Sequence, residues 1–417
     1  ILPGERLGVR EILEDAPQDA AATENVSLAA NVPAARTVAS WPQSHVSPSA
    51  RTLNSALSAN LTPLWSTSIG QGDSRRARII TDPVGADGRV FTIDSAGRVS
   101  ATSTSGEALW SYSLVPLRDD ASQASAGGLA YDSGRLYVTS GFGTLSAVDA
   151  ASGEEIWTQR LTSTATGAPT VFGGLVYVVA GDSTAWAIEA EDGRVRWQQD
   201  GLGDVSNVAG AAPPAVSDRH VVFSFGSGAV QGAFRQGGLR LWSADIVGAR
   251  RGFAIALVDD ITGYPVIDGN SVYAGNHSGR VVALNVNSGE RLWTAQHGAL
   301  EPVWPVGGSV YFVSDLNELV RLDAETGAQI WTVELPGYEP VRRPQRRRDS
   351  AFVNHGPIMA GGRLIIASSD GFIRAFDPAS GDLVTQTEIP RGATTRPVVA
   401  NGVLYVVSKN GTLHAYR

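Results

Sequence analysis

The sequence contains no cysteine, and this absence removes several kinds of chemistry at once. Disulfides, thiolate metal sites, covalent haem attachment and a cysteine nucleophile are all excluded. A basic excess is also lacking, since 33 Lys and Arg residues face 41 Asp and Glu residues and the net charge is −8. Proteins that bind nucleic acid usually carry a basic excess. We therefore expect no nucleic-acid partner.

Long hydrophobic runs are missing as well, because no stretch approaches the ~18 apolar residues of a membrane-spanning helix. The chain begins at Ile1 rather than at methionine, so we expect that an upstream leader was removed and that any lipid anchor lies outside this sequence.

Residues 1–60 are rich in Ala, Ser, Pro, Asn and Thr and show no sustained hydrophobic period. They are expected to form an extended, partly disordered leader, in which Trp41 could pack on the main domain.

The chain is rich in glycine and tryptophan, with 47 and 10 residues among 417. In one recurring motif a glycine precedes a tryptophan by four positions, as in "AVDAASGEEIW" at 147–157. The pairs are Gly106 and Trp110, Gly153 and Trp157, Gly193 and Trp197, Gly238 and Trp242, Gly289 and Trp293, and Gly327 and Trp331. Gly381 keeps the glycine but is followed by Thr385, and Trp65 lacks the preceding glycine.

A second motif, a turn followed by a β-branched and aromatic strand such as "GRLYV" or "GVLYV", occurs eight times. A shorter strand lies between the two motifs, and a strand often opened by proline precedes them. Each repeat is thus four antiparallel strands, A to D, with the tryptophan on D. A repeat of about 45 residues is typical of a propeller blade. The sequence predicts an all-β, eight-bladed β-propeller of four-stranded antiparallel blades over residues 61–417.

The two ends of this region complement each other. The strand at Trp65 is a D strand without A, B and C strands before it, whereas residues 395–417 supply A, B and C strands without a D strand. We expect the N-terminal strand to pair with the C-terminal blade and close the ring, which removes the edges that an open array would expose.

The repeated tryptophans could mark a repeated ligand site or a repeated unit of architecture. Nearly every blade carries one, whereas a single bound molecule needs only one site. We therefore interpret them as blade-docking residues that bury a large flat surface against the next blade. The residues are Trp65, Trp110, Trp157, Trp197, Trp242, Trp293 and Trp331.

The D-strand motif resembles the tryptophan-docking repeat of eight-bladed quinoprotein dehydrogenases and their non-enzymatic relatives. With its blade count, compact length and leader, the chain is similar to the BamB-like propeller lipoproteins of the outer-membrane β-barrel assembly machinery, particularly the alphaproteobacterial ones. This resemblance implies a non-enzymatic scaffold, lipid-anchored on the periplasmic face of the outer membrane. Its implied partners are the barrel-forming subunit and, as a further candidate, nascent outer-membrane protein strands.

Two other readings stay open: a periplasmic quinoprotein-like (PQQ-dependent) dehydrogenase or ligand-binding sensor, and an interaction propeller of another envelope complex. A dehydrogenase would need a quinone pocket, a bound cation with oxygen ligands and a catalytic carboxylate. The six histidines show no metal-ligand spacing, and nothing marks a nucleophile. We expect no catalytic residue, metal or cofactor.

Three connectors from a D strand to the next A strand are long, at 199–212, 244–263 and 333–356. They must share one face of the propeller, and long loops on one face favour a docking surface. In the BamB-like family two neighbouring inter-blade loops bind the partner. The matching residues are Val205 and Val208 in the first loop and Asp259 and Asp260 in the second, with Arg250 and Arg251 as candidates for an arginine that the first loop lacks. We assign no function to the arginines between positions 342 and 348.

Overall fold

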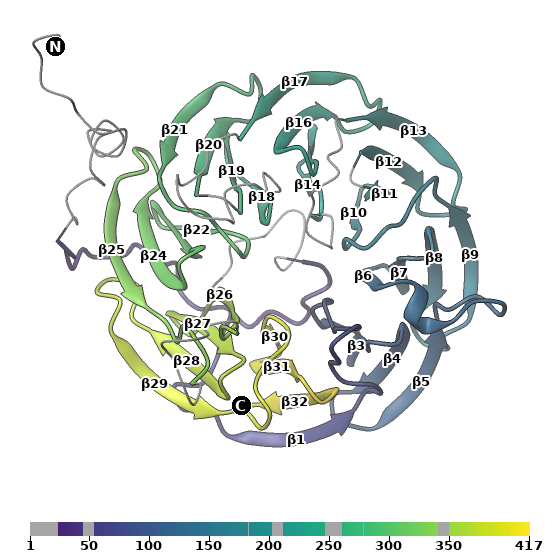
Figure 1. Ribbon diagram of the computed structural model, residues 1–417, viewed down its shortest axis with the longest axis horizontal. Helices are drawn as coiled ribbons and strands as arrows, with labels where there is room; N and C mark the ends of the chain where they lie inside the picture. The colour runs from purple at the N-terminus through teal and green to yellow at the C-terminus, as the bar shows by residue number, and fades with distance from the viewer. Residues whose placement is uncertain are drawn as a thin grey trace, which may run out of the picture.

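The computed structural model describes residues 24–44, 54–181, 183–201, 212–246, 261–277, 279–340 and 350–417. These residues form eight four-stranded antiparallel sheets arranged in a ring (Figure 1). The predicted eight-bladed β-propeller is therefore confirmed. Within the described ranges the one helical element is a 3₁₀ turn, η1 (Ala121–Gln123), and no helix is long and apolar enough to cross a membrane.

Each blade runs from an inner strand A to an outer strand D. Blades 1 and 2 contain β2 (Val84–Ala86), β3 (Arg89–Ile93), β4 (Arg98–Ser103) and β5 (Ala108–Ser113), then β6 (Ala126–Asp132), β7 (Arg135–Ser140), β8 (Thr144–Asp149) and β9 (Glu155–Arg160). Blades 3 and 4 contain β10 (Thr170–Phe172), β11 (Leu175–Ala180), β12 (Thr184–Glu189) and β13 (Val195–Asp200), then β14 (Ala215–Val216), β15 (His220–Ser224), β16 (Ala229–Phe234) and β17 (Arg240–Asp245).

The remaining blades complete the ring. Blades 5 and 6 contain β18 (Gly263–Asp268), β19 (Ser271–Gly275), β20 (Val281–Asn285) and β21 (Arg291–Ala295), then β22 (Trp304–Val306), β23 (Ser309–Val313), β24 (Glu318–Asp323) and β25 (Gln329–Glu334). Blades 7 and 8 contain β26 (Asn354–Ala360), β27 (Arg363–Ser368), β28 (Phe372–Phe376) and β29 (Leu383–Glu388), then β30 (Val398–Ala400), β31 (Val403–Ser408), β32 (Thr412–Tyr416) and β1 (Pro63–Ser68).

The ring closes at blade 8, where the first strand of the propeller pairs with the last. In the β1–β32 register, Trp65 lies opposite Ala415 and Ser68 lies opposite Thr412. Thr62 and Arg417 extend the pairing by exchanging two backbone hydrogen bonds of 2.8 and 2.9 Å. The expected closure is confirmed, and β32 is thereby no longer an open edge.

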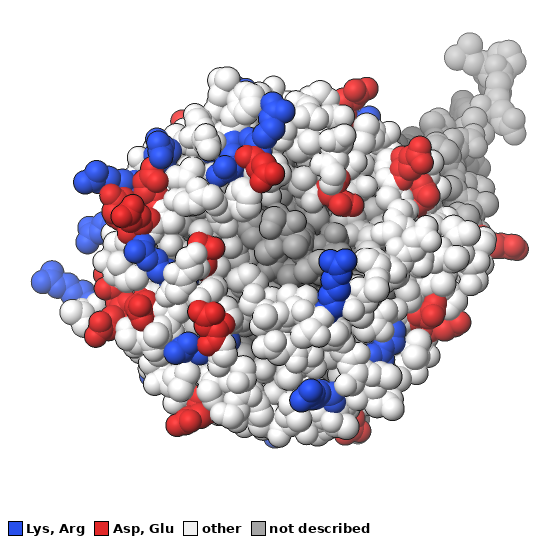
Figure 2. Space-filling view, turned by 180° about the vertical axis from the view of Figure 1, so that it is seen from behind, with Lys and Arg blue, Asp and Glu red and all other residues white. Residues whose placement is uncertain are grey.

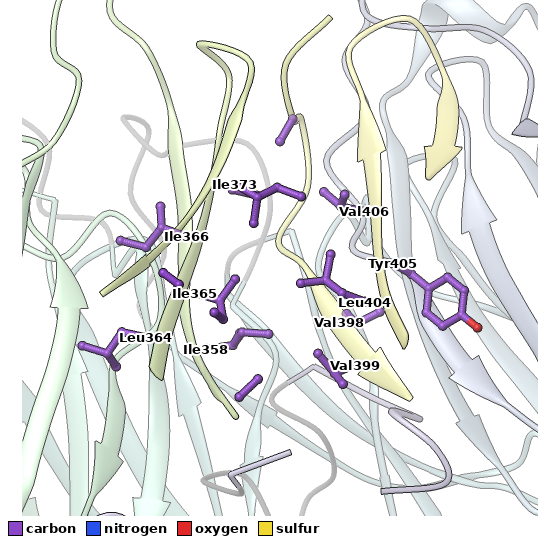
Figure 3. Packing of buried hydrophobic residues seen from close by; sticks show 14 of the residues in the cluster. Ile358, Leu364, Ile365, Ile366, Ile373, Val398, Val399, Leu404, Tyr405 and Val406 are labelled. Carbon is purple, nitrogen blue, oxygen red and sulfur yellow. The ribbon is translucent and has the colours of Figure 1, made fainter. Parts of the chain in front are cut away.

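The core lies between adjacent blades, because the A, B and C strands are buried on both faces. In β11, for example, all six residues are buried. Figure 3 shows the interface of blades 7 and 8, where Ile365 and Ile373 face Val398 and Leu404. Burying each such aliphatic side chain stabilises the fold by roughly 1.5–3 kcal/mol. Each blade therefore depends on both neighbours.

The D-strand tryptophans contact the glycine of the next blade and not the glycine of their own motif. Trp157 of blade 2 donates a hydrogen bond from Nε1 to the Ala190 carbonyl in blade 3, at 3.2 Å. A methyl group on Gly193 of blade 3 would lie 2.7 Å from the Trp157 ring. The same contact joins Trp65 to Gly106, Trp110 to Gly153, Trp197 to Gly238, Trp242 to Gly289, Trp293 to Gly327, and Trp331 to Gly381. Each glycine thus allows both the positive φ of its turn and the close approach of a ring.

This pairing explains why Thr385 stands where blade 7 would carry a tryptophan. A ring at that position would pack on the C–D turn glycine of blade 8. Blade 8 has no such turn, because its C and D strands, β32 and β1, come from opposite ends of the propeller. The missing ring at Thr385 and the missing glycine before Trp65 therefore belong to the same interface.

Candidate functional site at the two ends of the central channel

The loops of the propeller divide between two faces. The A–B and C–D hairpin turns lie on one face, which we call the turn face. The B–C loops and the D–A connectors lie on the other, which we call the connector face. All three long connectors singled out in the sequence join a D strand to the next A strand, so they share the connector face.

Residues 24–44 and 54–62 follow the turn face in an almost wholly extended conformation (Figure 1). The Val38 carbonyl accepts a hydrogen bond from the Asn401 amide in the A–B turn of blade 8, at 2.7 Å. Oδ1 of Asn54 accepts one from the Gly362 amide in the A–B turn of blade 7, at 3.0 Å. These stretches of the expected leader are bound to the propeller, mostly through backbone groups. We call residues 24–44 the N-terminal strap.

Trp41 anchors the strap in the central channel. It exchanges two backbone hydrogen bonds, of 2.6 and 2.9 Å, with Gly85 on β2 of blade 1. Its ring stacks on Trp304 of blade 6 with centroids 6.1 Å apart, and only 3% of Trp41 is exposed. The side-chain amide of Gln43 pairs with the backbone of Val171 in blade 3, with both hydrogen bonds 2.9 Å long. The strap thus links blades 1, 3 and 6 at the turn-face end of the channel.

Arg321 on β24 holds the strap to blades 6 and 7. It is 1% exposed and lies opposite Trp331 in the strand register. Its guanidinium donates hydrogen bonds to Oγ of Ser309 and to the carbonyls of Leu28, Ala29, Pro378 and Ala379. The other seven C strands carry a small residue at this register, namely Ala101, Ala147, Ala187, Gly232, Ala283, Ala375 and Ala415.

A charged cluster lies where the channel opens on the connector face. Arg396 contacts Asp82 at 2.5 Å and Glu301 at 3.6 Å, and its guanidinium lies 5.2 Å from the centre of the Tyr264 ring. Glu301 also contacts Nδ1 of His355 at 3.0 Å. Burial opposes the charge of Arg396, but the carboxylates of Asp82 and Glu301 raise its pKa above the ordinary value. Arg396 is therefore a fixed cation whose charge is already neutralised.

In the described part of the chain, the channel shows no set of side chains that would hold a cation beside a quinone. Its cavity, about 790 Å³ with the open mouth included, is lined by Trp41, Trp304, Arg396 and the prolines that open several A strands. Among the described residues, no three carboxylate or histidine side chains come together to hold a metal ion. Trp41 and Trp304 stack on each other, and Arg396 is engaged by two carboxylates. Among the described residues, the two large rings and the one cation of the lining are thus already engaged within the protein.

The predicted docking residues, Val205, Val208, Arg250, Arg251, Asp259 and Asp260, lie outside the described residues. The structure does place the ends of their two connectors. One joins β13 to β14 and the other joins β17 to β18, so they leave neighbouring blades on the same face. Buried Ile246 and Ile261 fix the second connector where it enters and leaves the core. The arginines at 342, 343 and 346–348 also lie outside the described residues.

Sequence reasoning missed a fourth long connector, at 69–83 between β1 and β2. It supplies Asp82 to the channel mouth and carries Arg75, Arg76 and Arg78 near its tip. The run "SRRAR" was a usable signal, because it places three arginines within four residues of a chain whose net charge is negative. On the side of the molecule shown in Figure 2, by contrast, acidic and basic side chains are intermingled near the rim.

Comparisons with known proteins agree with this geometry. The family described as outer membrane protein assembly factor BamB matches residues 95–333 and 317–417. BamB of Salmonella typhimurium is 28% identical over 359 residues, 85% of this chain and 88% of that protein. The crystal structure of BamB from Moraxella catarrhalis has a TM-score of 0.70 at 19% identity and covers 86% of this chain and all of that one.

Quinoproteins share the fold as well. The quinohemoprotein alcohol dehydrogenase from Comamonas testosteroni has a TM-score of 0.67 at 16% identity and covers 92% of this chain and 81% of that one. At this identity the likeness concerns the arrangement of the blades and not the chemistry of the channel.

Proposed function

This chain belongs to the family of outer membrane protein assembly factor BamB, and on that premise we propose that it is a non-enzymatic scaffold for outer-membrane protein assembly. The observation that carries this proposal is that the two faces of the propeller carry different segments of the chain. The turn face is occupied by the strap, whereas long connectors from adjacent blades gather on the connector face. Among the described channel residues, Arg396 is paired with a carboxylate and Trp41 is stacked on Trp304.

We place the scaffold in the periplasm, held on the outer membrane by a lipid anchor upstream of this sequence. The support is the family name, outer membrane protein assembly factor. The partner is the barrel-forming subunit of the assembly complex. Nascent outer-membrane strands are a second candidate partner, since D strands present free outer edges at the rim.

Docking is assigned to the connectors that follow β13 and β17. Asp259 and Asp260 are expected to meet basic groups on the partner, with Arg250 and Arg251 beside them. Val205 and Val208 would supply apolar contact from the neighbouring connector. The assignment rests on the resemblance of these residues to the family's docking loops and on the shared face of the two connectors.

The test is affinity purification of the tagged protein from solubilised envelope. We expect the barrel-forming subunit to copurify with the parent chain, and Asp259→Ala with Asp260→Ala to reduce its recovery at least about tenfold. Removing one side of a desolvated charge pair costs about 2–5 kcal/mol, whereas a solvated rim charge costs much less. The melting temperature should not change.

The matched control is Arg346→Ala with Arg347→Ala in the connector two blades away, which should copurify like the parent. If this control loses the partner while the aspartate variant keeps it, the wrong connector has been assigned. A quinone-like absorbance in the purified protein, with dye-linked alcohol oxidation, would contradict the scaffold and support the oxidoreductase.

A further inference from the structure

Six basic side chains gather on the connector face of blades 8 and 1. They are Arg75, Arg76, Arg78, Arg98, Arg391 and Lys409, which we call the basic patch. Five are exposed and Lys409 is partly exposed. The loops that carry them are joined by backbone hydrogen bonds, because Lys409 bonds to Asp73 through its carbonyl and to Gly392 through its amide.

The patch has no internal counter-ions. Within the part of the chain that the structure describes, none of its six side chains forms an ion pair or a hydrogen bond. The carboxylates of the same loops are already engaged. Asp73 accepts hydrogen bonds from the Ile79 amide and the Thr394 hydroxyl, at 2.8 and 2.7 Å.

The other two carboxylates of these loops are engaged as well. Asp94 is 2% exposed and accepts hydrogen bonds from the backbone amides of Gln71, Ala96 and Arg98. Asp82 is paired with Arg396. The loops at 69–83, 94–98, 389–397 and 408–411 together hold seven basic and three acidic residues, a formal charge of +4 in a chain of −8. The positive field of the patch is therefore directed at solvent.

A groove runs beside the patch. Arg78 and Lys409 line it, and Ile80 and Val353, which are 41% and 43% exposed, contribute aliphatic surface. With its open mouth the groove encloses about 740 Å³. Aliphatic side chains exposed in a hollow beside unpaired cations present a partner with both apolar and charged contacts.

We propose that this groove and the basic patch bind an acidic, aliphatic-containing segment of another protein. The carboxylates of the segment would pair with the arginines, whose planar guanidinium groups match carboxylates in two-pronged hydrogen bonds. An aliphatic side chain between the carboxylates would enter the groove against Ile80 and Val353. A chain segment fits a hollow, whereas a flat lipid surface meets only its rim.

The basic patch can be tested separately from the docking assigned to the connectors after β13 and β17. The basic patch belongs to blades 8 and 1, whereas those connectors belong to blades 3 to 5. Loss of one site would therefore leave the other intact, and the two proposals can fail separately.

The probe is a fluorescent synthetic peptide of repeating Glu-Glu-Leu, titrated against the full chain by anisotropy. We expect Arg75→Ser with Arg76→Ser and Arg78→Ser to weaken binding about tenfold or more, since several charge pairs are lost together. Raising the salt from about 50 mM to about 300 mM should weaken binding to the parent, because exposed charges are screened. The control, Arg194→Ser with Arg196→Ser and Arg240→Ser, changes the net charge equally on the turn face and should bind like the parent.

Three results would overturn the proposal. The first is equal peptide binding by the two triple variants, which would show that net charge alone attracts the peptide. The second is binding to phosphatidylglycerol vesicles that requires the three patch arginines when the peptide does not bind, which would assign the patch to a membrane. The third is full displacement of the peptide by millimolar phosphate, which would reduce the site to a simple anion site. A thermal melt of each variant confirms that these mutations at exposed positions leave the fold intact.

Discussion

A chain that starts at Ile69, and so lacks β1, is expected to lose cooperative folding, whereas a chain that starts at Leu61 keeps it. Without β1 the outer strand of blade 8 becomes β32, an unpaired edge that promotes aggregation. Trp65 also disappears from its place between Tyr405, 5.9 Å away, and the C–D turn of blade 1, where Thr104 accepts its hydrogen bond. Thermal melts and size-exclusion chromatography measure the difference.

Both truncated chains lack residues 1–60, so the comparison isolates the eight residues of 61–68. Identical melting of the two chains would contradict the closure. The full-length chain offers a second measurement, because it has no native cysteine. Ser68→Cys with Thr412→Cys joins a cross-strand pair of β1 and β32 and should form a disulfide that raises the melting temperature. Ser68→Cys with Ser113→Cys, on β5 of the next blade, should not cross-link.

Removing the ring of Trp157 is expected to lower the free energy of unfolding by about 3–5 kcal/mol, as large-to-small changes in a packed core do. The ring covers Gly193 in the next blade, contacts Tyr137 with centroids 6.0 Å apart, and donates a hydrogen bond to the Ala190 carbonyl. Denaturant unfolding of Trp157→Ala measures the loss. Unchanged stability together with loss of a bound small molecule would instead make the tryptophan a ligand residue.

The partner of this ring offers a matched pair of glycines. Gly193 has a φ of +76° and would place a methyl group 2.7 Å from the Trp157 ring, whereas Gly174 has a φ of +78° and open space around it. Both alanine variants carry the strain of a positive φ. Gly193→Ala should therefore lower the free energy of unfolding by about 1–3 kcal/mol more than Gly174→Ala does, which is the usual cost of overpacking. In the Trp157→Ala background this difference should shrink. Equal costs in the parent chain would show that the turn, and not the ring, requires glycine.

The propeller could be predicted because its blades repeat. A glycine, a tryptophan and a β-branched strand recur in register, and the unmatched strand at Trp65 reveals the closure. The reason for Thr385 could not be read from one repeat, because each ring packs on the glycine of the following unit. That relation appears only when neighbouring blades are placed side by side.

The packing of Trp41 on the propeller was expected and is confirmed, whereas the rest of the N-terminal strap escaped prediction for a different physical reason. Its contacts use backbone amides and carbonyls, as at Val38 and Gly85, and these groups leave no trace in composition. The contact between Arg321 and the strap is an exception, because the sequence carries a signal for it. Aligning the C strands shows alanine or glycine at its register in the other seven blades, so a lone arginine there demands a nearby set of acceptors.

The central claim, that the connector face carries the partner, is tested most directly by photo-crosslinking from matched positions on opposite faces of the same blades. Asp200 and Asp245 end β13 and β17 on the connector face, whereas Asp192 and Gln236 lie in the C–D turns of these two blades, and all four are exposed. With a photoreactive residue at each position in turn, we predict cross-links to the barrel-forming subunit from positions 200 and 245 and none from 192 and 236. Cross-links from the two turn-face positions alone would contradict the account.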